Sequence, residues 1–346
     1  MKNQTAYLTG AQKIELRDSE MPRMAPDEVL VEVKHVGICG SDVMFYEDPS
    51  VGGRLDTPLP VVLGHESAGV VVEVGAQVTG LAPGDRVALE PGVPCGKCRW
   101  CLSGKYNLCP QVNFMACAPW ERAALSRYIT HPAAFSFKLP DNVSTLEGAL
   151  VEPLAVGLHA ASRAGAGLGQ TAVILGSGCI GLMTLLACRS MGVSRVVMAD
   201  LFDNRLETAA SLGADLTVNS GKEDLTQRVL EFTGGLGADL VFETAGSPVT
   251  TALTPGLVMR GGRIVLVGNI HEKVSFDFFA LNSKEVDVLS VFRYRNLYPV
   301  AIQAIAAGSI PVAKVATNFF PFEEAAKAFD VAKNQKQTAL KVVVEF

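Results

Sequence analysis

The chain has 346 residues and a mass of 36.6 kDa, more than one ordinary hydrophobic core accommodates, so we expect two domains. Hydrophobic residues make up 49% of the sequence and charged residues 19%, which excludes an intrinsically disordered protein. The net charge is −5 and no block of basic residues occurs, which argues against nucleic acid as a partner.

The N-terminal part of the chain, to about residue 150, is predicted to be rich in β-strands. Short alternating runs, such as 28–39 and 68–75, are separated by Pro and Gly. The first twenty residues contain no apolar segment followed by a cleavage site of small residues. We therefore expect no secretory signal and a cytoplasmic location.

A dispersed set of metal-binding side chains occurs in this part: Cys39 in VGICGSD, His65 and Glu66 in GHESAG, and Glu152 in VEPLAVGLH. One thiolate, one imidazole and one or two carboxylates leave room for water, as a catalytic zinc requires. Each residue also has an ordinary structural role open to it: a buried Cys, a hydrogen-bonded core His, a carboxylate that caps a helix. Taken together, the four residues favour a metal site over four separate structural roles.

Four cysteines lie within fifteen residues of one another: Cys95, Cys98, Cys101 and Cys109. Four thiolates without a His are typical of a closed structural zinc site, which has no position for substrate. Free buried cysteines and a redox relay are the alternatives. A relay does not need four cysteines, so we expect a zinc ion that orders a long loop.

From about residue 171, apolar strands alternate with helical stretches of roughly ten to fifteen residues. This alternation predicts βαβ units and a parallel sheet with helices on both faces. The predicted strands are TAVIL, RVVMAD, LTVN, ADLVFETAG, GRIVLVG and DVLSVFRY. The tail from Tyr298 predicts a helix and an edge strand that rejoin the first domain.

One uncharged stretch, between Arg163 and Arg189, is long enough to cross a bilayer. It contains six glycines together with Gln, Ser and Thr residues, which suit a strand, a tight loop and a helix better than a lipid-facing helix. We therefore expect no membrane partner.

That stretch contains the glycine-rich run Gly176-Ser177-Gly178-Cys179-Ile180-Gly181. The run follows a predicted strand and precedes a predicted helix, and the next strand ends at Asp200, where an acid that reads a ribose is expected. Asp200 would accept bonds from the ribose hydroxyls and repel a 2′-phosphate, so NAD is favoured over NADP. Arg205 could weaken that preference or stack near the adenine. The alternative is an incidental glycine turn in a flavodoxin-like sheet.

Taken together, these motifs resemble the zinc-dependent medium-chain dehydrogenases. The motifs that carry the likeness are GHExxGxVxEVG at 64–75, GDRV at 84–87, the four-cysteine loop and the dinucleotide turn. Within the family, 90–98, 138–142, 152–160 and 291–296 resemble the sorbitol (L-iditol) and xylitol dehydrogenase branch. The likeness covers essentially the whole chain.

The resemblance implies an α/β protein with two zinc ions per chain, NAD as cofactor and a homo-oligomeric assembly, a tetramer or a dimer. A β-rich GroES-like catalytic domain would comprise residues 1–153 and 295–346. A doubly wound parallel-sheet (Rossmann) domain that binds the dinucleotide would comprise residues 154–294.

The family resemblance also implies roles for individual residues. Cys39, His65 and Glu66 would hold the catalytic zinc, with Glu152 holding metal-bound water or substrate, although which of the two glutamates touches the metal stays open. Ser41 would pass the alcohol proton outward. Substrate would meet Arg293, Tyr294, Phe114 and Glu152. The cofactor would contact Gly176, Gly178, Ile180, Gly181, Asp200, Arg205, Val267, Gly268, Asn269, Val291 and Arg293.

The chain departs from the family near the expected pocket. Met44 and Phe45 replace a His and a Tyr, so a proton route and a substrate hydroxyl are missing. The segment 116–128 replaces a Pro-rich loop and carries Cys117 where the branch often has Thr. We therefore expect a changed pocket rim and do not carry over the polyol's identity.

The expected activity is reversible oxidation of a secondary alcohol of a polyol of the sorbitol, xylitol or galactitol class to a ketose. A butanediol or threonine dehydrogenase on the same scaffold is the alternative within enzymology. A protein that binds NAD and zinc without turnover is the alternative outside it.

Overall fold

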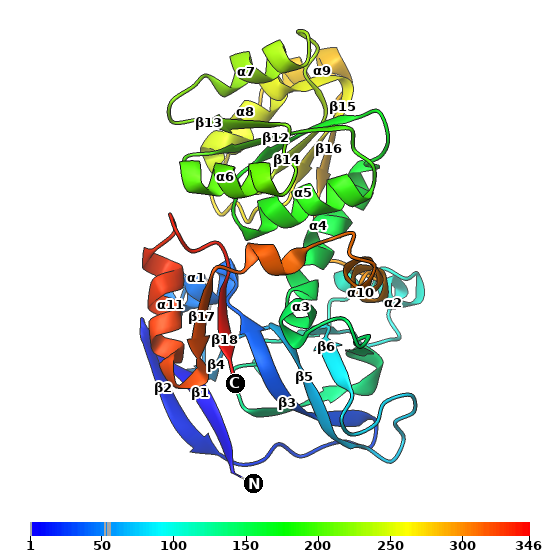
Figure 1. The fold of residues 1–346 in the computed structure, drawn as a ribbon, viewed down its shortest axis with the longest axis vertical. Coiled ribbons are helices and arrows are strands. Elements are labelled where there is room, and N and C mark those ends of the chain that lie inside the picture. The colour runs from blue at the N-terminus through cyan, green and yellow to red at the C-terminus, as the bar shows by residue number, and fades with distance from the viewer. Residues whose placement is uncertain (1, 52, 54–56) are drawn as a thin grey trace. The chain divides into compact units, whose positions relative to one another are not determined.

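The computed structural model describes residues 2–51, 53 and 57–346 and divides into two compact units (Figure 1). The first unit comprises Met1–Glu152, Tyr298–Gly308 and Val312–Phe346. The second comprises Pro153–Leu297 and Ser309–Pro311. Each unit has its own buried core, as expected for a chain of this length.

The first unit is built on β-sheets. A three-stranded sheet has the order β2 (Lys13–Ser19), β1 (Asn3–Gly10), β4 (Val61–Val62). A larger sheet has the order β10 (Ser136–Lys138), β6 (Arg86–Leu89), β5 (Glu66–Val74), β3 (Glu28–Gly37), β18 (Val342–Glu345), β17 (Asn318–Pro321), and β9 (Tyr128–Pro132) also pairs with β3. β7 (Gly92–Val93) pairs with β8 (Asn113–Phe114).

Short helices join these strands. They are α1 (Gly40–Glu47), α2 (Arg99–Leu102), α3 (Thr145–Ala149), α10 (Tyr298–Ala306) and α11 (Ala325–Asn334), with 3₁₀ turns at Tyr106–Leu108, Ala133–Phe135, Val312–Val315 and Phe322–Glu324. The core comes from the alternating apolar residues of the strands and from α11, including Leu8, Val31, Leu89 and Phe329.

The C-terminal strand differs from its prediction. We expected an edge strand, but β18 lies inside the larger sheet, antiparallel to β3 and parallel to β17. The run Val342, Val343 and Val344 is buried, as suits a strand with neighbours on both sides. The edge position belongs to β17.

The second unit contains the parallel sheet predicted from the strand–helix alternation. Its order is β13 (Leu216–Asn219), β12 (Arg195–Asp200), β11 (Thr171–Leu175), β14 (Ala238–Glu243), β15 (Val258–Leu266), β16 (Asp287–Ser290), and all its pairings are parallel. This is the doubly wound order, with a switch point between β11 and β14. The predicted α/β class is thereby confirmed.

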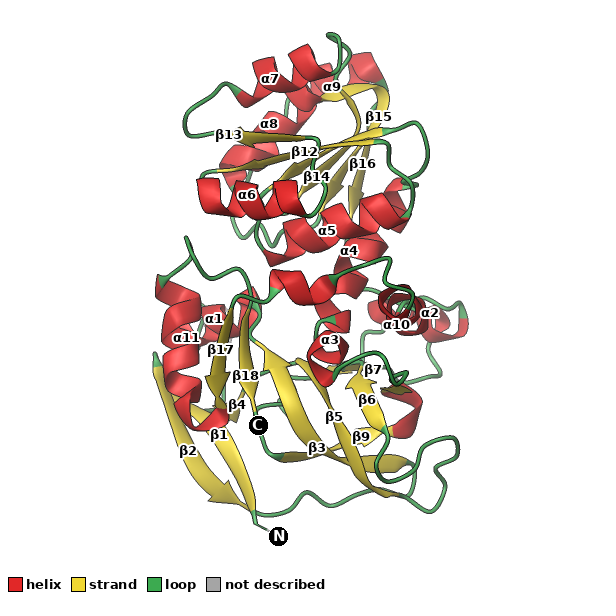
Figure 2. Ribbon diagram, in the orientation of Figure 1, coloured by secondary structure: helices red, strands yellow, loops and turns green. Residues whose placement is uncertain are grey.

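Helices cover this sheet (Figure 2). They are α5 (Cys179–Ser190), α6 (Asp203–Ser211), α7 (Leu225–Phe232), α8 (Pro248–Leu257) and α9 (Phe278–Lys284), while α4 (Val151–Ala164) begins at the end of the first unit's long segment. The uncharged stretch forms β11, the glycine turn and α5. No helix in the described part of the chain combines the length and the apolar character needed to cross a bilayer.

Candidate metal centre and dinucleotide turn

Cys39 lies at the start of α1, where Asp42 fixes the backbone. Cys39 is the N-cap residue, and its N–H donates to Asp42 Oδ2 at 3.0 Å. The other carboxylate oxygen, Oδ1, accepts the Gly64 N–H at 3.0 Å and lies 3.5 Å from His65 Nδ1. One buried carboxylate therefore fixes the backbone at Cys39 and at the residue before His65.

His65 is buried beside two groups that can carry negative charge. Burial disfavours the charged ring, but Asp42 and Cys39 outweigh that effect and hold the pKa of His65 well above its usual range. The ring of Phe114 lies 5.5 Å from the imidazole, centroid to centroid. His65 thus occupies a site with one apolar wall and strong attraction for a positive charge.

Glu66 begins β5 and forms a buried ion pair with Lys341. Its two carboxylate oxygens lie 2.6 and 2.7 Å from Lys341 Nζ, which also donates to the Ile38 carbonyl at 3.0 Å. The carboxylate fits against β3 because residue 37 is glycine: a Cβ there would stand 2.1 Å from Glu66 Oε2. Both partners are almost fully buried, so neither charge is screened by water.

The structure brings Cys39, His65 and Glu66 together. One ligand atom from each lies within 4.8 Å of the others. Glu152, buried in the first turn of α4, is not a member of that group. Ser41 lies half-buried in α1, two residues after Cys39. One sulfur, one imidazole and one carboxylate suit a catalytic zinc that keeps a coordination position for another oxygen.

A second buried carboxylate, Glu90, lies in electrostatic contact with Glu152. Burial raises the pKa of Glu90 to about 7, and the charge of Glu152 acts in the same direction. The Tyr106 hydroxyl donates to Glu90 Oε1 at 2.7 Å and opposes that rise. Because Tyr106 belongs to the loop of the four cysteines, Glu90 links that loop to the surroundings of Glu152.

The four cysteines converge as a separate cluster. Their sulfur atoms all lie within 4.8 Å of one another, and Cys98 Sγ and Cys101 Sγ are 3.3 Å apart. The Cys95 N–H points at Cys109 Sγ at 3.5 Å. The set fits a closed tetrahedral zinc site.

The glycine turn in the second unit requires glycine at two positions. Gly176 has a φ of +99°, which L side chains rarely adopt, and a Cβ at Gly181 would stand 1.8 Å from the Gly176 carbonyl oxygen. Gly178 is different, because a Cβ there would meet only Arg205 Nη1 at 3.6 Å. Beside that open space α5 begins without a side-chain cap, and the buried Ser177 Oγ has no hydrogen-bond partner among the described residues. A phosphate fits such a turn.

Asp200 ends β12 beside the turn. Its Oδ2 accepts the Ser177 N–H at 2.7 Å, and its Oδ1 accepts the backbone N–H groups of Leu201 and Phe202 at 2.8 and 3.1 Å. Arg205 Nη1 lies 3.9 Å from Asp200 Oδ2, and the guanidinium stacks over Phe202. The Asp200 carboxylate is therefore held in one position by backbone N–H groups on both of its oxygens.

The remaining predicted cofactor residues also lie in the second unit. Ile180 is in the first turn of α5, where its carbonyl accepts the Thr184 hydroxyl at 2.8 Å. Val267 and Gly268 follow β15 and donate their N–H groups to the Glu243 carbonyl, and Gly268 packs so closely on Gly246 that a Cβ would stand 2.3 Å from its nitrogen. Asn269 follows them and is exposed.

Val291 follows β16 and donates its N–H to the Leu266 carbonyl at 3.0 Å. Arg293, expected at both cofactor and substrate, has a φ of +54° and stacks over Phe292. Such a backbone costs about 1–3 kcal/mol in a non-glycine residue and concentrates at functional sites. Tyr294, by contrast, is only 3% exposed.

The two departures from the family meet in the structure. Phe45 and Trp120 pack edge to face, with ring centroids 5.0 Å apart. Met44 packs against the same core. The loop reaches this contact through left-handed backbone at Ala116 and Trp120, with φ of +56° and +67°. The segment that carries Cys117 therefore packs an aromatic ring against Phe45.

Sequence reasoning missed Asp42, Glu90 and Lys341 as parts of the site. Asp42 had a local signal, since an acid three residues after the N-cap is typical of a capping box. Glu90 and Lys341 had none, because their partners lie far away in the sequence: Lys341 is 275 residues from Glu66.

The sequence matches two protein families along its length. Residues 25–141 match the alcohol dehydrogenase GroES-like domain, and residues 179–307 match the zinc-binding dehydrogenase family. The chain is 47% identical to the uncharacterized zinc-type alcohol dehydrogenase-like protein YdjJ of Escherichia coli, covering 100% of this chain and 99% of that protein. It is 39% identical to human sorbitol dehydrogenase, covering 99% and 96%.

Among solved structures, 2R,3R-butanediol dehydrogenase from Bacillus subtilis has a TM-score of 0.90 at 29% identity, covering 99% of both chains. The resemblance drawn from the motifs is thus confirmed, and the chain is an oxidoreductase rather than a non-catalytic binding protein. It belongs to the zinc-binding medium-chain alcohol dehydrogenases, in the branch that contains the sorbitol dehydrogenases.

Proposed function

We propose that the protein reversibly oxidises a secondary alcohol of a polyol, of the sorbitol, xylitol or galactitol class, to a ketose with NAD as hydride acceptor. The observation that carries the proposal is the buried convergence of Cys39, His65 and Glu66 within 4.8 Å. These three residues would hold a zinc ion, which would supply the Lewis acidity that makes an alcohol easier to deprotonate. The four-cysteine cluster would hold a second, structural zinc.

The residues around the set have separate tasks in this proposal. Asp42 orients the imidazole of His65, and Lys341 holds the carboxylate of Glu66 in place. Glu152 binds the substrate oxygen or a water. Ser41 takes up the alcohol proton and passes it toward water or a cofactor hydroxyl.

NAD is the proposed cofactor because Asp200 is fixed by the Ser177 N–H of the turn and by the two backbone N–H groups that follow β12. A fixed carboxylate accepts bonds from two ribose hydroxyls and repels a 2′-phosphate. Arg205 already lies beside this carboxylate, which leaves less of its charge for a phosphate. Arg293 and Tyr294 would present a cation and a hydroxyl to a hydroxyl-rich substrate.

One observation favours a less polar substrate, such as a butanediol. Phe45 and Trp120 pack together where the branch has a Tyr hydroxyl, so one polar contact to substrate is lost. We also propose that the protein assembles as a homo-oligomer, either a tetramer or a dimer.

Initial rates of NADH formation on sorbitol, xylitol, galactitol, 2,3-butanediol and threonine test the substrate class, and the same assay with NADP tests the cofactor. We expect the highest kcat/KM for a hexitol or pentitol with NAD, and two zinc ions per chain. Threonine or butanediol as the best substrate would contradict the polyol assignment, and a preference for NADP would contradict the role of Asp200.

Cys39→Ala tests the metal role in the same assay. We expect loss of turnover and of one zinc per chain with NADH affinity unchanged, because the substituted thiolate lies in the other unit from the turn. The matched control is Cys188→Ala, which removes a buried thiol remote from both clusters in sequence and should keep activity. Activity retained by Cys39→Ala would refute the metal role.

A further inference from the structure

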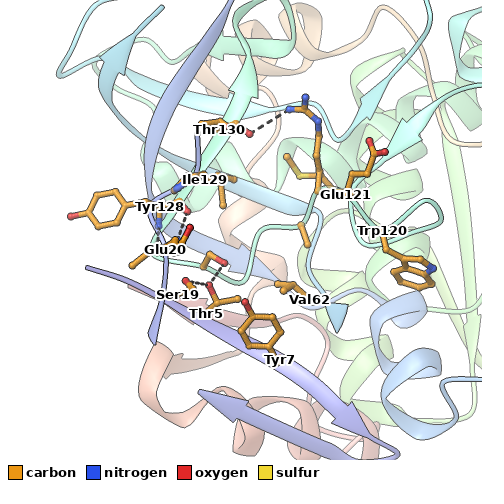
Figure 3. Close-up of a pocket in the computed structure, with 16 residues that line it drawn as sticks. Thr5, Tyr7, Ser19, Glu20, Val62, Trp120, Glu121, Tyr128, Ile129 and Thr130 are labelled. Atoms are coloured by element: carbon orange, nitrogen blue, oxygen red, sulfur yellow. Dashed lines mark hydrogen bonds between the residues drawn. The ribbon is translucent and has the colours of Figure 1, made fainter. Parts of the chain in front are cut away.

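A cavity of about 230 Å³ lies in the β-rich unit and is many times larger than the space one ordered water needs. Strands β1 and β9, the end of β2 and the segment 115–123 line it. Figure 3 shows Thr5, Ser19 and Glu20 on one side of this cavity, and Trp120 and Glu121 on the other. None of the metal-binding residues lines it, so it is separate from the site described above.

A row of three hydroxyls runs along the cavity wall. Thr5 Oγ1 lies 2.8 Å from both Ser19 Oγ and Ser126 Oγ, and either atom of each pair can donate. Three hydroxyls have three donors, and two bonds use two of them, so one donor and several lone pairs remain for a ligand. Because either hydroxyl of each pair can be the donor, the three side chains can donate a hydrogen bond to a ligand hydroxyl or accept one from it.

The charges on the wall select against anions. Glu20 and Glu121 line the cavity as carboxylates. Among the described residues that line the cavity, Arg122 is the one cationic group, and it donates to Glu28 Oε1 at 2.7 Å. Glu28 is not part of the lining, so the charge of Arg122 is already neutralised. A phosphate or carboxylate ligand would therefore face repulsion without a compensating cation.

The wall also has an apolar side, formed by Val62, Met115 and Ile129. A ligand that fits must combine C–H surface with several hydroxyls that both donate and accept. We propose that this cavity is a second, non-catalytic binding site for a small polyhydroxylated molecule that carries no negative charge. This proposal does not rest on the catalysed reaction and would survive failure of the substrate panel.

The site is connected to the catalytic unit through its wall. Met115 follows Phe114, whose ring contacts His65, and Trp120 packs on Phe45 in the helix that begins after Cys39. A ligand in the cavity therefore contacts the segment that packs against the metal-binding residues.

Trp120 provides the measurement, because the chain has only one other tryptophan, Trp100. In the zinc-loaded Trp100→Phe protein, the fluorescence of Trp120 is titrated with myo-inositol and xylitol as neutral probes and with gluconate as an anion. We expect a saturable change with the neutral probes and none with gluconate. No saturable change with either neutral probe, or equal or tighter binding of gluconate, would overturn the proposal.

Thr5→Val removes the middle hydroxyl of the row at nearly constant volume and should weaken the binding about tenfold. Thr9→Val, on the same strand but outside the cavity, is the control and should leave it unchanged. Ser19→Ala, which removes another hydroxyl of the row at a half-buried position, repeats the test should Thr5→Val lower the melting temperature. Equal binding by the cavity variants and Thr9→Val would overturn the proposal.

Cys39→Ala in the same Trp100→Phe background separates this site from the catalytic one. The fluorescence change should persist with the same dissociation constant, since Cys39 does not line the cavity. A change that disappears in this variant would come from the catalytic site and would overturn the proposal.

Discussion

Glu66 and Lys341 form an ion pair with side chains 1% and 4% exposed, beside Cys39 and His65. A buried pair is not in itself a strong source of stability, because both charges lose their hydration. Removing one partner is costly, however, since the other charge stays buried and unpaired. The position of Glu66 therefore depends on Lys341.

We expect Lys341→Met to lower the free energy of unfolding of the zinc-free protein by about 3–5 kcal/mol, because it leaves the Glu66 carboxylate buried without a cation. It should also speed the loss of one zinc to a chelator, since Lys341 no longer positions Glu66. Urea denaturation and the rate of zinc release measure the two effects.

The control for that variant is Lys327→Met. Lys327 pairs with Glu324 at 2.8 Å, but both side chains are exposed, so the loss should be below about 1 kcal/mol and zinc release should not change. Similar stability of both variants would show that the buried pair has no positioning role.

At the scale of elements, the glycine turn between β11 and α5 contains glycines that are there for different reasons. Gly181 is required by packing, because its Cα lies against the Gly176 carbonyl. Gly178 is not required by packing, because the space beside it is open. A glycine that packing does not require, at the start of a helix, is expected where a ligand approaches the backbone.

Alanine at these two positions should therefore have opposite effects. Gly181→Ala should lower stability by about 1–3 kcal/mol or more, because the methyl group overlaps the Gly176 carbonyl. Gly178→Ala should melt within a few degrees of the unmodified protein yet bind NADH more than about tenfold more weakly, because its methyl group lies where the pyrophosphate is proposed to approach. Thermal melting and NADH fluorescence titration measure both. Unchanged NADH affinity in Gly178→Ala would show that the cofactor does not approach this glycine.

The turn shows how far local sequence predicts an element. Glycine spacing after an apolar run demands one backbone conformation, so the strand, turn and helix appear as predicted. The place of β18 was not predictable in this way. Val342, Val343 and Val344 suit any buried strand, and only pairing with β3, about 300 residues earlier, places it inside the sheet.

At the scale of the whole molecule, folding buries His131 in its neutral form. Its Nε2 lies 2.9 Å from the Glu90 carbonyl oxygen. Burial, with the charge of Arg122 beside it, lowers the pKa of His131 to about 3 from 6.5. The unfolded chain therefore binds a proton below about pH 6.5 that the folded chain does not, and stability falls as the pH falls from 6.5 toward 3.

Because of His131, the free energy of unfolding should be about 2 kcal/mol lower at pH 5 than at pH 7. His131→Gln keeps a donor for the Glu90 carbonyl but cannot take up a proton when unfolded. The variant should be less stable at pH 7, yet should lose about 2 kcal/mol less than the unmodified protein on acidification. Urea denaturation at the two pH values gives the difference, and equal losses would show that His131 does not stay neutral when buried.

The sequence by itself determined the chemical groups and the local conformations: two sets of side chains that could hold a metal ion, a glycine turn suited to a phosphate and an alternation that requires a parallel sheet. These follow from ligand chemistry and from steric limits within a few residues, which the order of the amino acids states directly. The tertiary structure decided that Lys341 pairs with Glu66, that Trp120 packs on Phe45 and that β18 lies between β3 and β17. Such contacts depend on which distant segments bury each other's apolar and charged groups, and that is settled only when the whole core packs.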